Sequence, residues 1–152
     1  MDNRPWVPHT TVAAICERDG RYLLVKETIN GSIVYNQPAG HLEADESLVE
    51  AVVRETMEET RYQFTPNALQ GIYRYTAADP GGKTYIRYLF RGLTGNCIEG
   101  ALDDGIISAE GLTYDQVVMC QSQHRTPLVL QCIDDYLNNP GYPLEIFNQN
   151  YI

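Results

Sequence analysis

Short apolar runs separated by turn-forming residues fill the first part of the chain, which is the pattern of β-strands. Residues 11–16 and 22–26 are apolar and rich in β-formers, and the Arg-Asp-Gly at 18–20 between them predicts a hairpin. Asn-Gly at 30–31 is a second turn signal, and residues 33–35 after it predict a short strand. We therefore expect this part of the chain to be β-structure.

Residues 47–62 predict a helix. Ser47 can cap it, Glu50 three residues later completes a capping box, and no Pro or Gly interrupts the run, so about four turns are expected. Pro38 and Gly40 bend the chain just ahead of this helix. An entry loop followed by a capped helix is therefore predicted.

The acidic residues of this helix lie where apolar residues are normally found. An apolar stripe runs along its first half, formed by Leu48, Ala51 and Val52. At about 100° per residue, Glu55 and Glu59 continue that stripe and Glu58 lies beside them, whereas an ordinary solvated face would lie opposite it. Arg54 and Arg61 are expected on the opposite side of the helix.

Three carboxylates on one patch repel one another unless a cation lies between them. Oxygen ligands of this kind suit a hard divalent cation such as Mg²⁺ or Mn²⁺. The alternative is a charged helix end that frays into water. The spacing favours a metal site.

Strands are also predicted after the helix, at residues 69–77 and 84–93, with a shorter one at 63–65. The Asp-Pro-Gly-Gly sequence at 79–82 between the two longer strands predicts a turn. Four aromatic residues occupy these strands: Tyr73, Tyr75, Tyr85 and Tyr88. Such side chains pack on sheets, and the alternative is that one of them lines a substrate pocket.

Residues 94–108 are predicted to form a loop, with four acidic side chains in it or just after it: Glu99, Asp103, Asp104 and Glu110. Loops of this length often carry function, although a solvated acidic loop is the alternative. Thr113 caps a predicted helix over 114–120, and Thr126-Pro127 begins another that runs to Leu137. Arg125 precedes that last helix, where it either contacts a phosphate or belongs to an exposed surface pair.

Composition and charge narrow the class of protein. The 152 residues are 43% hydrophobic and 20% charged, as expected of one globular domain spanning residues 1–152. Apolar runs fall short of the roughly 20 residues that span a bilayer. The N-terminal residues do not resemble a signal peptide, so a cytoplasmic protein without membrane association is expected. A net charge of −9 argues against binding nucleic acid. The widely spaced cysteines are expected to be free thiols: Cys16, Cys97, Cys120 and Cys132.

Residues 40–62 resemble the signature of the Nudix hydrolase family. That signature is Gly, five residues, Glu, seven residues, Arg-Glu, an aliphatic residue, any residue, Glu-Glu, any residue, Gly and an aliphatic residue. Six residues match its fixed positions: Gly40, Glu46, Arg54, Glu55, Glu58 and Glu59. Thr56 stands where an aliphatic residue is usual, and Arg61 where the last Gly is usual. Because Gly suits a left-handed helix terminus, Arg61 suggests a different exit from the helix.

The resemblance implies an α/β fold of the Nudix type, an α/β/α sandwich around a mixed β-sheet. It also implies that Mg²⁺ or Mn²⁺ is held by three catalytic glutamates and one backbone carbonyl: Glu55, Glu58, Glu59 and the carbonyl of Gly40. Glu46 and Arg54 match a structural pair that ties the loop to the helix and so orients the ligands. The general base is either Glu55 or an acid from the later loop, with Glu99 and Asp103 among the candidates.

Four further stretches look like the NudJ-type bacterial phosphatases: residues 27–31, 36–46, 125–128 and 142–145. This resemblance implies a Mg²⁺-dependent enzyme that hydrolyses phosphoanhydride bonds in nucleoside di- and triphosphates and in small pyrophosphates, such as that of a thiamin precursor, and releases phosphate. The alternatives are a nucleoside triphosphate pyrophosphohydrolase and a catalytically silent Nudix-fold metabolite sensor. The expected partner is a small nucleotide or pyrophosphate, with the chain a monomer or homodimer.

Overall fold

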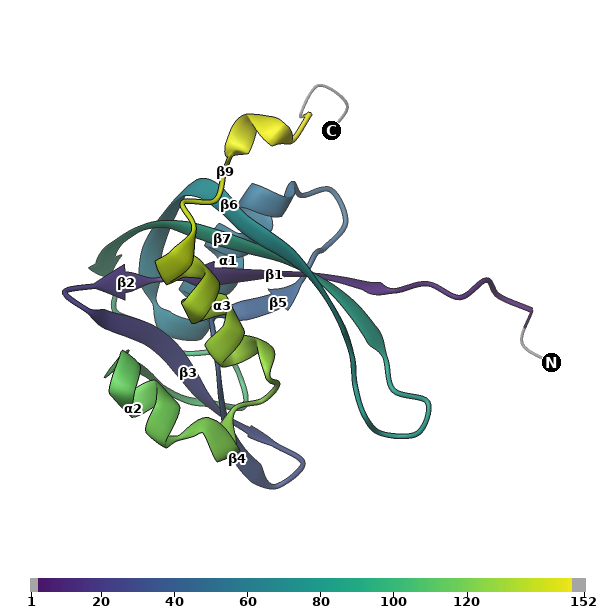
Figure 1. The fold of residues 1–152 in the computed structure, drawn as a ribbon, viewed down its shortest axis with the longest axis horizontal. Coiled ribbons are helices and arrows are strands. Elements are labelled where there is room, and N and C mark those ends of the chain that lie inside the picture. Colours follow the sequence, from purple (N-terminus) through teal and green to yellow (C-terminus); the bar gives the residue numbers. More distant parts are fainter. Residues whose placement is uncertain (1–2, 149–152) are drawn as a thin grey trace.

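The computed structural model describes residues 3–148, so residues 1–2 and 149–152 of the predicted domain lie outside it. Its larger sheet has the strand order β5-β1-β7-β6-β9 (Figure 1). These strands are β1 (His9–Ile15), β5 (Ala39–His41), β6 (Tyr62–Thr76), β7 (Thr84–Cys97) and β9 (Tyr142–Pro143). The β1–β7 pair is parallel and the other neighbours are antiparallel, so the sheet is mixed.

A second sheet is antiparallel throughout and is built around one strand, β3. Its members are β2 (Glu17–Arg18), β3 (Arg21–Ile29), β4 (Ser32–Asn36) and β8 (Ile106–Thr113). Both β2 and β4 pair with β3, and β8 pairs with β3 as well. The turns predicted at 18–20 and 30–31 join β2 to β3 and β3 to β4. The predicted hairpin between residues 11–16 and 22–26 was wrong, because β1 pairs with β5 and β7 in the larger sheet and only the short β2 pairs with β3.

Helices cover both faces of the larger sheet (Figure 1). The helical elements are α1 (Leu48–Thr60), α2 (Tyr114–Met119), α3 (Leu128–Asn138) and two 3₁₀ turns, η1 (Gln121–Gln123) and η2 (Leu144–Ile146). Alternation along β1 explains the layers, because successive side chains of a strand point to opposite faces. Val12 and Ala14 pack in the core that includes α1, whereas Ala13 and Ile15 pack in the core that includes α2 and α3. The predicted α/β/α arrangement around a mixed sheet is therefore confirmed.

The start of α1 is the element that the sequence predicted best. The Ser47 side chain accepts a hydrogen bond from the Glu50 backbone N–H, and the Glu50 carboxylate accepts one from the Ser47 N–H. This capping box fixes the first turn of the helix, and the apolar residues Ala51 and Val52 are fully buried. The predicted helices that follow Thr113 and Thr126-Pro127 also form, as α2 and α3.

The exit from α1 differs from the prediction. Arg61 itself adopts the left-handed conformation, with φ 64° and ψ 10°, and its backbone N–H donates to the carbonyl of Met57. The helix therefore ends in the geometry that glycine normally supplies, although a side chain is present. The expectation of a different helix exit was wrong.

Two predicted boundaries were also wrong. The strands predicted at 63–65 and 69–77 form one strand, β6, because β-bulges opposite β7 absorb the irregular residues between them. The predicted loop at 94–108 is shorter, residues 98–105, because β7 continues to Cys97 and β8 begins at Ile106. Ser, Ala, Glu and Gly in β8 give a weak strand signal, and pairing with β3 supplies the stability that these residues lack.

None of the helices in residues 3–148 has the length and apolarity needed to cross a bilayer.

Candidate active site

A cavity of about 780 Å³ opens where α1, β5 and β7 meet the start of α3. Acidic side chains line one part of its wall, namely Glu43, Glu55 and Glu59. Two arginines, Arg87 and Arg125, line it as well. The cavity therefore presents both carboxylates and guanidinium groups, which can act on different parts of one anionic molecule.

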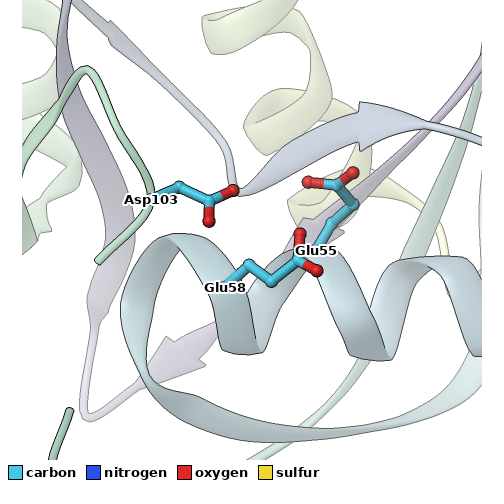
Figure 2. Close-up of side chains that lie close together, drawn as sticks. All are labelled: Glu55, Glu58 and Asp103. Atoms are coloured by element: carbon cyan, nitrogen blue, oxygen red, sulfur yellow. The ribbon is translucent and has the colours of Figure 1, made fainter. Parts of the chain in front are cut away.

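Three carboxylates converge beside this cavity. Oxygen atoms of Glu55, Glu58 and Asp103 all lie within 4.8 Å of one another. Figure 2 shows that two of these side chains come from α1 and that Asp103 reaches the same place from the connection between β7 and β8. The Asp103 backbone N–H donates to the carbonyl of Glu58 at 3.0 Å, which holds this connection against the end of the helix.

Glu59 is the most enclosed of the signature glutamates. Its side chain accepts a hydrogen bond of 2.8 Å from the Ala39 N–H, and the residue is only 9% exposed. Burial raises the pKa of Glu59 to about 8, and the nearby Glu55, Glu27 and Asp103 carboxylates add to this rise. The sequence placed Glu59 among three clustered glutamates, but the structure joins it to β5 and places Asp103 in the cluster.

Gly40 lies directly against Glu55. A Cβ atom built on Gly40 would overlap the Glu55 carboxyl group, so only glycine allows this carboxylate to reach the loop. Burial raises the pKa of Glu55, and the nearby Arg54 guanidinium opposes that rise. The sequence-based expectation that Gly40 and Glu55 share one site is thus matched by their positions, with both lining the cavity.

Arg54 connects the entry loop to the acidic side of α1. Its Nε and Nη2 atoms donate to the two carboxylate oxygens of Glu46 at 2.9 and 2.7 Å. Its Nη1 atom donates to Glu55 at 2.9 Å and to Glu58 at 3.2 Å. The long side chain thus returns to the carboxylates, and the expectation that it lies on the opposite side of the helix was wrong. Hydrogen bonding to Arg54 also lowers the pKa of Glu46.

Of the four acids proposed from the late loop, only Asp103 joins the cluster. Glu99 and Asp104 are exposed, and Glu110 lies within β8. Arg125 lies at the cavity, where its Nη1 atom donates to the buried Glu27 carboxylate at 2.9 Å. Arg125 is exposed and paired, as the alternative of an exposed surface pair expects, and it also lines the cavity, where it could contact a phosphate.

Arg87 is a cavity residue that the sequence analysis missed. It is 7% exposed, and its guanidinium donates to the side-chain oxygens of Asn36 and Gln37, both at 3.1 Å. No carboxylate forms an ion pair with Arg87 in the described part of the chain. A buried guanidinium with neutral partners favours a bound anion. The sequence signal was a charged residue between the apolar residues Ile86 and Leu89 of the predicted strand.

Aromatic rings form another part of the cavity wall. The rings of His9, His41 and Tyr85 contact one another with centroids 5.6 to 6.2 Å apart, and His41 and Tyr85 line the cavity together with Tyr75. Burial lowers the pKa of His41, and the nearby His9, Lys83 and Arg125 lower it further. A neutral aromatic wall can contact the organic group of a substrate.

The donor set fits a hard divalent cation. Carboxylate oxygens from two chain segments converge, and like charges this close repel one another unless a cation neutralises them. The close approach of Glu55 to Gly40 also brings the Gly40 backbone to this group. The chemistry of the residues is thus that of a Mg²⁺ or Mn²⁺ site.

The signature, the fold and this group of carboxylates define the class of protein. The sequence model of the NUDIX domain matches residues 7–130, and the chain belongs to the Nudix hydrolase family. One relative is the Phosphatase NudJ of Escherichia coli strain K12, which is 40% identical over 141 residues, 91% of this chain and 90% of that protein.

Solved structures agree with this assignment. A NUDIX hydrolase from Nitrosomonas europaea is 46% identical, with a TM-score of 0.90 over 93% of this chain and 97% of that one. A bifunctional NMN adenylyltransferase/ADP ribose pyrophosphatase from Francisella tularensis, solved with AMP and a Mn ion, shares the fold alone. It is 19% identical, with a TM-score of 0.72 over 89% of this chain and 43% of that one. The chain is therefore an enzyme, a hydrolase of pyrophosphate bonds.

Proposed function

We propose that this enzyme is a Mg²⁺-dependent phosphatase of nucleoside di- and triphosphates and of small pyrophosphates, such as that of a thiamin precursor. The observation that carries this proposal is the cavity itself, which is lined by the Glu55 and Glu59 carboxylates together with guanidinium groups and aromatic rings. A phosphoanhydride with an aromatic group matches all three kinds of wall. The similarity to Phosphatase NudJ supports release of phosphate rather than pyrophosphate.

The proposed roles follow from the contacts of each residue. Glu55, Glu59 and the Gly40 carbonyl would hold the ion, with Glu58 as a further ligand or as a support for them. Mg²⁺, or Mn²⁺ in its place, would neutralise phosphate oxygens and make a bound water more acidic. Glu46 would keep Arg54 oriented toward Glu55 and Glu58.

Asp103 is our choice for the residue that takes the proton from the attacking water. Glu55 and Glu58 both accept hydrogen bonds from Arg54, so their oxygen atoms are already engaged and less free to take a proton from water. The Asp103 side chain has no such partner among residues 3–148, and it lies on the exposed side of the cluster. As the water oxygen bonds to phosphorus and the bond to the leaving oxygen breaks, the water proton passes to Asp103.

Arg87 and Arg125, which line the same cavity, would bind the phosphate groups. Arg87 is fixed by Asn36 and Gln37, and Arg125 is fixed by Glu27. Planar guanidinium groups suit phosphate oxygens because two N–H groups can bind them together. The single-domain organisation over residues 1–152, an assembly no larger than a homodimer and a cytoplasmic location remain parts of this proposal.

A substrate panel tests the proposal. ATP, GDP, a thiamin-precursor pyrophosphate and ADP-ribose would be incubated with and without Mg²⁺, in ¹⁸O-labelled water, and phosphate and pyrophosphate would be quantified. We expect Mg²⁺-dependent release of labelled phosphate, at least about 100-fold weaker in Glu59→Gln, and a higher KM in Arg87→Gln. Pyrophosphate release would instead indicate the pyrophosphohydrolase. Failure to turn over any of these compounds would overturn the proposed substrate class.

A further inference from the structure

The residue that departs most from the family signature contacts the same connection that carries Asp103 to the site. Arg61 occupies the position of the last glycine and has a left-handed backbone despite its side chain. A side chain makes this conformation less stable than the right-handed form, because Cβ approaches the following carbonyl oxygen. The contacts that the Arg61 guanidinium makes therefore indicate why a side chain is present at this position.

The Arg61 side chain extends from the end of α1 to the connection between β7 and β8, residues 98–105. Its Nε donates to the carbonyl of Ile98 at 3.2 Å, and its Nη2 donates to the carbonyl of Glu99 at 3.3 Å. The Arg61 carbonyl in turn accepts a hydrogen bond of 2.7 Å from the Ile98 N–H. One residue thus binds the first part of this connection through its backbone and its guanidinium.

Gly100 makes room for this contact. A Cβ atom built on Gly100 would lie 2.9 Å from Cζ, Nε and Nη2 of Arg61, and its φ of 153° is one that side chains rarely adopt. Position 61 thus lacks the glycine of the family signature, and the Arg61 side chain that replaces it packs against another glycine, Gly100. The two residues form one unit that fixes the path of the connection.

Three residues beyond Gly100, the same connection delivers Asp103 to the carboxylate cluster. Asp103 is exposed, and its backbone is held by the hydrogen bond from its N–H to the Glu58 carbonyl. Its carboxylate faces Glu55 and Glu58, and this like-charge contact pushes it away from the site. Contacts that restrain residues 98–103 are therefore needed to keep Asp103 in place.

We propose that Arg61 is a positioning residue, which holds the connection at residues 98–103 against α1 and so places the Asp103 carboxylate beside Glu55 and Glu58. The inference rests on the proposed function for the role of Asp103. Arg61 does not line the cavity. Its effect is therefore on the rate of the chemical step and not on substrate binding.

Two substitutions of Arg61 distinguish the effect of losing its hydrogen bonds from the effects of losing its charge and of straining the backbone. Arg61→Gly restores the residue of the family signature and accepts the left-handed conformation, so it removes the contact without straining the helix end. Arg61→Lys keeps the positive charge but lacks the planar group that reaches two carbonyl oxygens. We expect both variants to lower kcat about 3- to 10-fold, the size expected for losing one or two such hydrogen bonds, with KM unchanged.

Arg18→Lys is the matched control. Arg18 also donates from its guanidinium to two successive carbonyl oxygens of the chain, those of Thr94 and Gly95 at 2.5 and 2.6 Å. These carbonyls lie within β7, ahead of the connection that carries Asp103. We therefore expect Arg18→Lys to retain the parent kcat.

The decisive readouts are coupling to Asp103 and hydrogen exchange. Asp103→Asn should lower kcat on its own, and adding Arg61→Gly to it should change kcat by less than about twofold, because the residue on which Arg61 acts is then inactive. In metal-free protein, the Asp103 amide should exchange faster in both Arg61 variants and at the parent rate in Arg18→Lys.

The outcomes test the positioning role of Arg61 and the proposed substrates separately. A parent-like kcat and a parent-like Asp103 exchange rate in Arg61→Gly would overturn the positioning role. The positioning role would also be overturned if Arg61→Gly lowered kcat by the same factor in the Asp103→Asn background as in the parent. A parent enzyme that turns over none of the panel compounds would instead refute the proposed substrates, while the exchange measurement would still test how Arg61 holds the connection.

Discussion

The buried Glu59 carboxyl predicts an unusual dependence of stability on pH in the metal-free protein. Its pKa is raised from 4.5 to about 8 in the folded chain, mainly by burial. Between these values the folded state binds a proton that the unfolded state has released, so the free energy of unfolding falls as pH rises. The stabilisation is fully present below about pH 4.5 and is lost as pH rises through about 8.

The magnitude follows from the size of the shift. Each pKa unit corresponds to about 1.4 kcal/mol, so the rise at Glu59 corresponds to about 5 kcal/mol across the whole interval as an upper value. That is a large part of the about 5 to 15 kcal/mol that stabilises a typical domain. Glu59→Gln keeps an oxygen that can accept the Ala39 N–H and carries no charge, so it should remove this dependence.

Urea unfolding in EDTA between about pH 5 and pH 8.5 measures the effect. We expect the parent to lose stability relative to Glu59→Gln as pH rises, with a slope that approaches 1.4 kcal/mol per pH unit. Glu145→Gln, at an exposed position, serves as the control and should follow the parent. Parallel curves for the parent and Glu59→Gln would refute the reasoning, because they would mean that Glu59 is ionised in the folded protein without penalty.

Two further predictions concern the signature residues. Gly40→Ala places a methyl group where the Glu55 carboxyl group lies, so we expect turnover to fall by about 100-fold or more, because displacing a reacting group by about 1 Å has that effect. Parent-like kcat in this variant would show that Glu55 can move without consequence. Thr56 is fully buried, and its hydroxyl donates to the Val52 carbonyl within the same helix. Thr56→Val leaves that carbonyl its helical partner, so thermal melting should show a stability within about 1 kcal/mol of the parent, and a larger loss would contradict this.

Local signals predicted the elements that local residues determine. The residues Ser47 and Glu50 predicted a capping box at the start of α1, and the structure contains this capping box. The turns at 18–20 and 30–31 were equally visible, because backbone conformations with positive φ are set by the residues that occupy them. The spacing of Glu55, Glu58 and Glu59 indicated a site before any contact was known.

Features that depend on distant parts of the chain were not visible. β8 forms because β3 offers it a partner, and its own residues have little tendency to be a strand. The sequence could not choose Asp103 over Glu99 or Asp104, because the choice depends on how residues 98–105 dock on α1. Arg87 was missed because its burial comes from Asn36 and Gln37, about fifty positions earlier in the chain.

The parallel pair of β1 and β7 also has a consequence for how the protein is made. Thr11 and Ile86, which meet across this pair, are 75 residues apart, and Val12, Ala13 and Ala14 between the two layers are fully buried. A ribosome exports β1 long before β7 exists, and pairing over such a separation is slow. During much of translation the nascent chain therefore exposes the apolar strand β1 without its partner β7. Aggregation is most probable in this interval, and chaperone binding is most useful then.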